Sequence, residues 1–193
     1  MGKRIAIIQG HPSPQQIHLC HALASAYEEG AFAAGHIVRR IEVAQLDFPL
    51  LRNAEDWNSG PLPEGLREAA ASIGWADHLV LIFPLWTGTM PALFKGFLEQ
   101  LVRPGFAFNV RPDDHSLMPA LTGKSARLVV TMAMPARLFC SSDSHGVRGL
   151  QRNILGFCGI KPVRATYIDM VDAKPFPAER WLANVRKLGR NGT

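Results

Sequence analysis

The stretch that decides the fold is VLIFPLWTGTMPALFKGFLEQLVRPGFAF, residues 80–108. Its first four residues are apolar, as in a strand that is covered on both faces of a parallel sheet, and a helical pattern begins at Ala92. The loop between them is stiff and largely uncharged, because Pro84 and Pro91 fix φ while Gly88 permits a close approach or a positive φ. It has neither the glycines and lysine of a phosphate loop nor the ligands of a metal site. The loop therefore suits a flat, uncharged group.

The same alternation of short apolar runs with longer amphipathic segments recurs along all 193 residues. It predicts a doubly wound α/β fold with five parallel strands, in a single domain over residues 1–193. The expected strands are Arg4–Gln9, Ile37–Val43, His78–Pro84, Ala126–Met132 and Val163–Ile168, and the expected helices are Gln15–Ala34, Glu64–Trp75, Ala92–Leu101, Gly146–Phe157 and Ala178–Leu188. The connection Gln45–Pro63 is rich in Pro, Gly and Asn but carries Phe48 and Trp57, which predicts a loop packed on the surface.

Composition limits the possible partners. The 21 Lys and Arg exceed the 16 Asp and Glu, which suits an anionic small ligand, but these cations are scattered, so no nucleic-acid partner is expected. Cys20, Cys140 and Cys158 form no CxxC pair, which indicates a reducing compartment. The longest apolar run, Leu79–Trp86, is too short for a membrane span. We therefore expect a cytoplasmic protein. We also expect no metal site, because the seven histidines form neither HxH nor HExxH.

Three loops should carry the chemistry, because ligands of open α/β sheets bind beyond the carboxyl ends of the strands. They read GHPSPQQIH from residue 10, PLWTGTMP from residue 84 and TMAMPARLFCSSDSHG from residue 131. The first has neither GxGxxG nor a P-loop pattern, but it opens a helix whose free N–H groups attract anions. His11, Ser13, Gln16 and His18 would surround a phosphate there. The alternative is a helix cap with solvated polar residues.

The other two loops could hold a planar ring. N–H groups from Leu85 to Thr89 could bond along the edge of the ring, with Trp86 as an apolar wall. Residues Thr131 to Met134 could lie under its other edge. Core packing of these apolar residues is the alternative in both loops. The serines near residue 141 lack the GxSxG pattern of a hydrolase.

Three segments, GHP after the first strand, FPLW…PAxxKGFxEQ…GFAF and GFCGI, resemble the flavodoxin-like NAD(P)H:quinone oxidoreductase family. That family includes quinone reductases, modulator-of-drug-activity-like proteins and ancillary flavoproteins of potassium efflux systems. The resemblance implies a flavodoxin-like sheet in order 2-1-3-4-5, a non-covalent flavin (FMN, or alternatively FAD), NAD(P)H as electron donor and a homodimer. It also implies ping-pong hydride transfer to a quinone-like acceptor. The implied flavin-binding residues are His11, Ser13, Gln16, Ile17, His18, Pro84, Leu85, Trp86, Thr87, Gly88, Thr131, Met132, Ala133 and Met134.

The chain departs from the family pattern at three places. Gln16 and Ile17 stand where a phosphate-binding Ser is usual, and Thr131 to Met134 replace Thr-Thr-Gly-Gly. Phe139 occupies the position of a Tyr, whereas His145 matches the family's His and is our candidate catalytic residue. A regulatory flavoprotein bound to a membrane transporter is the alternative function. An electron-carrier flavodoxin fits poorly, because such carriers are typically acidic.

Overall fold

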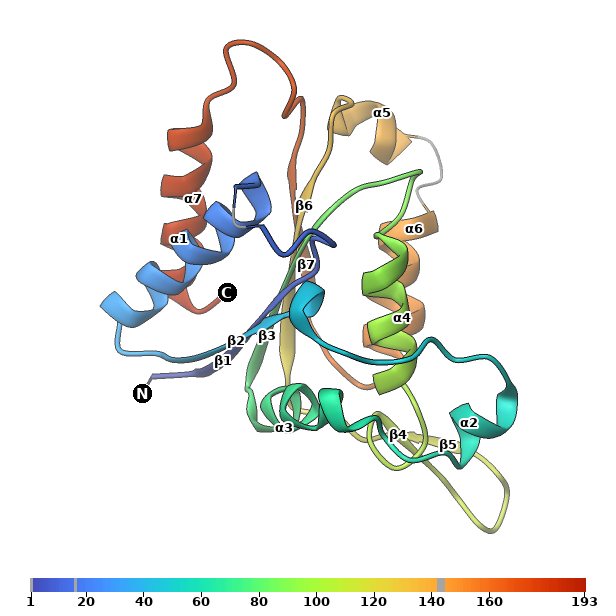
Figure 1. Cartoon of the computed structure of the whole chain (residues 1–193). Helices are drawn as coiled ribbons and strands as arrows, with labels where there is room; N and C mark the ends of the chain where they lie inside the picture. The colour runs from blue at the N-terminus through green and yellow to red at the C-terminus, as the bar shows by residue number, and fades with distance from the viewer. Residues whose placement is uncertain (1, 16, 142–144) are drawn as a thin grey trace.

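Five parallel strands form the central sheet in the order β2-β1-β3-β6-β7, which confirms the predicted order 2-1-3-4-5 (Figure 1). The computed structural model describes residues 2–15, 17–141 and 145–193, without the side chains of 139–141 and 145. The strands are β1 (Arg4–Gln9), β2 (Ile37–Glu42), β3 (His78–Pro84), β6 (Ser125–Thr131) and β7 (Val163–Ile168). All seven residues of β3 are buried, as its apolar sequence predicts for the central strand.

Helices cover both faces of the sheet (Figure 1). One face packs against α1 (Leu19–Ala33) and α7 (Ala178–Asn191). The other face packs against α3 (Arg67–Trp75), α4 (Ala92–Leu101), α6 (His145–Gly149) and the π-helix η3 (Leu150–Gly156). The remaining elements are short: η1 (Val43–Gln45), α2 (Ala54–Asn58), η2 (Glu64–Leu66), α5 (Ala136–Ser141) and a hairpin of β4 (Phe108–Val110) and β5 (Leu117–Pro119).

The first helix begins later than the sequence predicts, at Leu19 instead of Gln15. The main-chain N–H groups of Ser13 and Gln15 donate to the side chains of His11 and Ser13, at 3.1 and 3.3 Å. Such local bonds offer the backbone an alternative to the helix. The segment before Leu19 therefore belongs to the loop that follows β1. The predicted helix 146–157 is also wrong as one α-helix, since it is divided into α6 and η3.

The connection from Gln45 to Pro63 is packed against the body of the protein, as predicted. The buried Arg103 donates to the main-chain carbonyls of Asp56 at 2.6 Å and Gly60 at 3.0 Å. The Trp57 indole N–H donates to the Val102 carbonyl at 2.9 Å. The loop therefore satisfies buried donors below α4, at the end of the sheet remote from loop 85–91.

Two glycines let α1 and α7 approach until their backbones touch. A Cβ atom at Gly189 would lie 2.0 Å from the Tyr27 carbonyl oxygen, and one at Gly30 would lie 2.0 Å from the Arg186 carbonyl oxygen. Both obstacles are main-chain atoms, so neither can be relieved by a side-chain rotation.

Gly189→Ala is therefore expected to destabilise the protein, by about 1–3 kcal/mol, because the two helices must move apart. Gly74→Ala in α3 is the matched control, since a Cβ there meets only the Phe106 ring at 3.9 Å. Removing a helical glycine should leave that variant as stable as the wild type or more stable by about 0.5–1 kcal/mol. Urea unfolding measures both values, and a Gly189→Ala variant as stable as Gly74→Ala would contradict this packing.

Candidate functional site

The loops after β1, β3, β6 and β7 meet at the carboxyl edge of the sheet, where a cavity of about 310 Å³ lies. Its walls include His11 and His18 from the first loop, Pro84 at the end of β3, Thr131 at the end of β6 and the exposed Asp172 after β7. A larger hollow of about 960 Å³ borders η3. Its lining includes Val163 at the amino end of β7 and no residue at the carboxyl end of a strand, so its size does not make it the candidate site.

Three histidines form a cluster at one side of the cavity. The rings of His11 and His18 are stacked, with centroids 4.0 Å apart and an interplanar angle of 19°. The ring of His21, which is 2% exposed, lies 5.5 Å from His11 and 5.9 Å from His18. Rings stacked in this way cannot direct their nitrogens at one ion. Within the described part of the chain, no group of three or more His, Cys, Asp or Glu side chains is placed to hold a metal.

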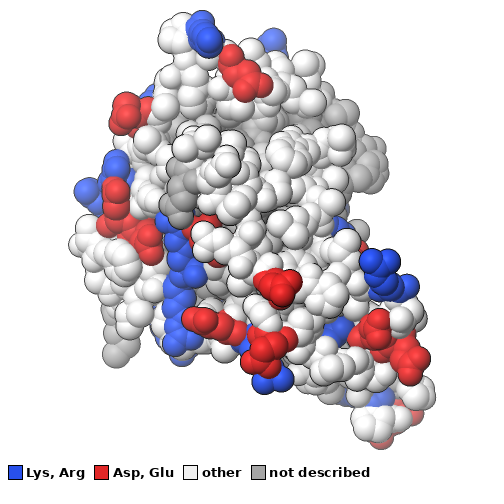
Figure 2. Space-filling model, viewed as in Figure 1, with Lys and Arg blue, Asp and Glu red and all other residues white. Residues whose placement is uncertain are grey.

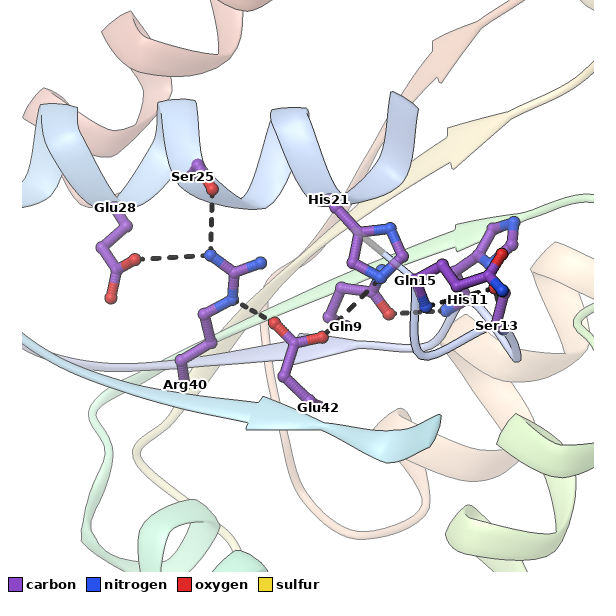
Figure 3. Close-up of polar contacts among 9 residues, drawn as sticks. All are labelled: Gln9, His11, Ser13, Gln15, His21, Ser25, Glu28, Arg40 and Glu42. Atoms are coloured by element: carbon purple, nitrogen blue, oxygen red, sulfur yellow. Dashed lines mark hydrogen bonds and ion pairs between the residues drawn. The ribbon is translucent and has the colours of Figure 1, made fainter. Parts of the chain in front are cut away.

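Hydrogen bonds fix the orientation of His11 (Figure 3). Its main-chain N–H donates to Gln9 Oε1 at 2.8 Å, and its Nδ1 accepts the N–H of Ser13 at 3.1 Å. The neutral ring therefore carries its hydrogen on Nε2. Burial, and then the neighbouring His18 and His21, lower the pKa of His11 to about 4, so that this ring is neutral at pH 7.

A carboxylate supports the third histidine from the opposite side (Figure 3). His21 Nε2 lies 4.0 Å from Glu42 Oε2, and the Arg40 guanidinium is paired with the same carboxylate. Arg40 Nη1 also donates to Ser25 Oγ at 3.0 Å, so this cation faces away from the cavity. Burial lowers the pKa of His21, whereas Glu42 opposes that shift. Among the described residues the buried His21 Nδ1 has no hydrogen-bond partner of good geometry, although the His18 main chain raises the pKa of this ring.

A tight turn follows β3. The N–H of Trp86 donates to the Thr89 carbonyl at 2.9 Å and that of Thr89 donates back at 3.0 Å, around Thr87 and Gly88 with φ of 47° and 81°. These dihedrals belong to the mirror-image hairpin turn. The Leu85 N–H donates to the Thr131 carbonyl at 2.7 Å. The prediction of free N–H groups from Leu85 to Thr89 is therefore wrong for three of the five.

The N–H groups of Thr87 and Gly88 have no acceptor among the described residues. The Trp86 side chain is 49% exposed, and its ring meets that of His11 edge to face at 5.9 Å. The turn thus presents two main-chain donors and an apolar ring beside the histidine cluster. Lys and Arg alternate with Asp and Glu over the lower part of the face in Figure 2, whereas the upper middle, where loop 85–91 lies, is largely uncharged.

The structure brings most of the predicted site residues to this edge of the sheet, but not all of them face the cavity. Ile17 is 82% exposed and turns its side chain outward. Met132 is a core residue whose N–H donates to the Ile168 carbonyl at 2.9 Å and whose carbonyl accepts from Val171 at 3.2 Å. Ala133 and Met134, by contrast, are exposed. Gln16 and the side chain of His145 lie outside the described residues.

The sequence interpretation missed His21 and Glu42. His21 follows His18 by three residues, the spacing that places two side chains on one face of a helix, so this signal was readable. Glu42 ends a strand remote in sequence, and only the pairing of β1 with β2 brings it close.

A family model described as a flavodoxin-like fold matches residues 3–189. The chain belongs to this flavodoxin-like fold family. A Penicillium crustosum protein named ribosyldihydronicotinamide dehydrogenase-like protein traD is 30% identical over 154 residues, which are 67% of this chain and 57% of that protein. FMN-dependent NADH:quinone oxidoreductase 2 from Listeria innocua is 34% identical over 105 residues, 52% of this chain and 46% of that enzyme. The chain thus aligns with about half the length of each relative.

Solved structures share the fold. The NAD(P)H:quinone oxidoreductase from Methanothermobacter marburgensis superimposes with a TM-score of 0.81 over 99% of this chain and 96% of that chain, at 22% identity. The resemblance that the sequence motifs indicated is confirmed. Among the described residues, no helix of this flavodoxin-like protein combines the length and the apolar character needed to cross a bilayer.

The low pKa of His11 predicts a pH dependence of stability. The unfolded chain binds a proton at His11 near pH 6.5 and the folded chain near pH 4. Between these values the unfolded state holds more protons, so the free energy of unfolding should fall as pH falls, by about 1.4 kcal/mol per pH unit for each such histidine. His11→Asn keeps an acceptor for the Ser13 N–H and should reduce this slope.

The matched control is His115→Asn, in an exposed loop at a φ of 56° that Asn tolerates. It should leave the slope unchanged. Bonds to Arg4 hold the pKa of Asp77 at about 2. The stability that this carboxylate contributes is therefore lost at lower pH than that of the measurement, and it does not affect the slope. Urea unfolding without ligand, from about pH 4.5 to about pH 6.5, measures how the free energy of unfolding changes with pH. Equal slopes for His11→Asn and wild type would contradict the prediction.

Proposed function

We propose that this chain is an FMN-dependent NAD(P)H oxidoreductase that reduces quinones or similar electron-poor acceptors. The observation that carries the proposal is that two unlike surfaces, the Trp86 turn and the histidine cluster, lie side by side, with the ring centroids of Trp86 and His11 5.9 Å apart. A flavin mononucleotide has the matching parts, a flat ring with a polar edge and a phosphate. The names of the fungal and Listeria relatives support this assignment, and the latter favours FMN over FAD.

The phosphate would lie against the start of α1. The N–H groups of Leu19 and Cys20 have no acceptor among the described residues, and the first turn of the helix carries no acidic residue. The helix dipole adds positive potential at this end. The side chains of Ser13 and of the clustered His11 and His18 would supply further donors.

The ring would lie against Pro84–Gly88 and the residues from Thr131 to Met134. The free N–H groups of Thr87 and Gly88 would bond to its edge, where they stabilise negative charge. Trp86 would cover apolar ring surface and exclude water. When bound, the flavin supplies acceptance and release of hydride, and the protein positions it.

His145 remains our candidate for stabilising charge on the ring or donating a proton. The start of α6 lies against the Trp86 turn, because a Cβ at Gly146 would be 2.3 Å from the Gly88 carbonyl oxygen. This contact supports a position of His145 next to the ring.

We also propose a homodimer. Large apolar side chains at the site are exposed, among them Trp86 at 49% and Met134 at 46%. Apolar patches of this kind commonly mark protein–protein contacts. The relatives named above give no support to a regulatory role at a membrane transporter.

The function is tested by following oxidation of NADH and of NADPH by purified protein with a soluble quinone. Oxidation should require both FMN and the quinone, because the flavin takes electrons from the nicotinamide donor and the quinone takes them from the flavin. Protein without flavin, and flavin without protein, are the controls. FMN-loaded protein that oxidises neither donor would refute the proposal.

Gly88→Val tests the placement of the ring. Valine disfavours a φ of 81° and would crowd the ring edge, so FMN affinity should fall by at least about tenfold. Gly123→Val is the matched control, because Gly123 has a φ of 77°, equally open surroundings and a position at the opposite edge of the sheet. Quenching of FMN fluorescence measures both affinities. Equal affinities in the two folded variants would place the ring elsewhere.

A further inference from the structure

We propose that the His11–His18–His21 cluster binds the flavin phosphate by taking up a proton, so that phosphate recognition in this protein is coupled to pH. The inference rests on the proposed function, because it assigns the phosphate of FMN to this cavity. It concerns how the chain supplies positive charge there.

The described residues that line the cavity include no Lys or Arg. The guanidinium of Arg40 is engaged by Glu42 and Ser25 on the far side of His21 (Figure 3). Asp172 lies at the rim and is exposed, and burial raises the pKa of the Cys20 thiol to about 11. The histidines are therefore the only described side chains at the cavity that can become positive at neutral pH.

Without an anion, His11 and His21 resist protonation, because burial lowers the pKa of each ring. Two imidazolium rings stacked at 4.0 Å would repel each other, and burial penalises even one charge. A phosphate monoester, with a second pKa of about 6, carries close to two negative charges at pH 7. Placed in the cavity, it reverses the balance and raises the pKa of the histidine that it touches.

Two further features bear on where that proton goes. Neutral His11 already carries a hydrogen on Nε2 that it can donate to the phosphate, whereas a second proton on this ring must go to Nδ1 and would displace the Ser13 N–H. Glu42 lies 4.0 Å from His21 and, like the His18 main chain, raises the pKa of this ring, so both favour positive charge in the cluster. Gln9 and Thr131 are neutral polar groups on the neighbouring strands, and the Trp86 ring meets His11 edge to face.

Coupling to a proton makes a quantitative prediction. Above about pH 6.5, where the phosphate no longer titrates strongly, the dissociation constant for FMN should rise with pH by up to tenfold per unit, the limit for one proton. Riboflavin has the same ring and no phosphate, so its affinity should change little over the same range.

Isothermal titration calorimetry of flavin-free protein with FMN, in buffers of different ionisation enthalpy at about pH 7, counts the protons directly. Wild type should take up a substantial fraction of one proton with FMN and close to none with riboflavin. His11→Asn and Glu42→Gln should reduce the uptake and flatten the pH dependence, whereas His115→Asn should match wild type. Circular dichroism and urea unfolding establish that each variant is folded.

The outcomes separate the inference from the function on which it rests. FMN binding without proton uptake, or equal uptake with riboflavin, would overturn the inference and leave the proposed function intact. Uptake that is unchanged in His11→Asn would also overturn it. Failure of wild type to bind FMN would overturn both.

Discussion

The hydrogen bonds by which each site loop leaves its strand hold this edge of the molecule together. The N–H groups of Gly10, Leu85 and Met132 each donate to a carbonyl of the adjacent strand, at 2.7, 2.7 and 2.9 Å. The parallel register pairs Pro84 with Thr131 at the same level. Because each loop begins bonded to its neighbour, the Trp86 turn and the histidine cluster have a fixed relation to one another before any ligand arrives.

The cluster offers a different solution to anion binding from that of a lysine or arginine. A permanent cation in a buried cavity is costly unless it is paired, and pairing would occupy the site. A neutral His11 avoids this cost in the empty protein, and an imidazole can acquire charge when an anion enters. The Glu42–Arg40 pair lies behind His21 and does not line the cavity. From there the Glu42 carboxylate favours positive charge on His21.

The sequence predicted the sheet well because its strands are defined by local apolar runs, and β1, β3 and β7 have the predicted bounds. It predicted the site less completely. The late start of α1 depends on bonds made by His11 and Ser13 that the helical pattern does not reveal. Thr87 adopts a positive φ, which is unusual for a β-branched residue, so a turn that consumes three N–H groups was not foreseen. The approach of Glu42 to His21 requires the tertiary pairing of β1 with β2.

The most direct test of the central claim, that the cavity and the turn bind two ends of one molecule, is a crystal structure of the protein with FMN. The account predicts the phosphate against His11, His18 and the start of α1, with the ring edge within hydrogen-bond distance of the Thr87 and Gly88 N–H groups. A phosphate bound away from the histidine cluster, or a ring bound away from the Trp86 turn, would contradict it.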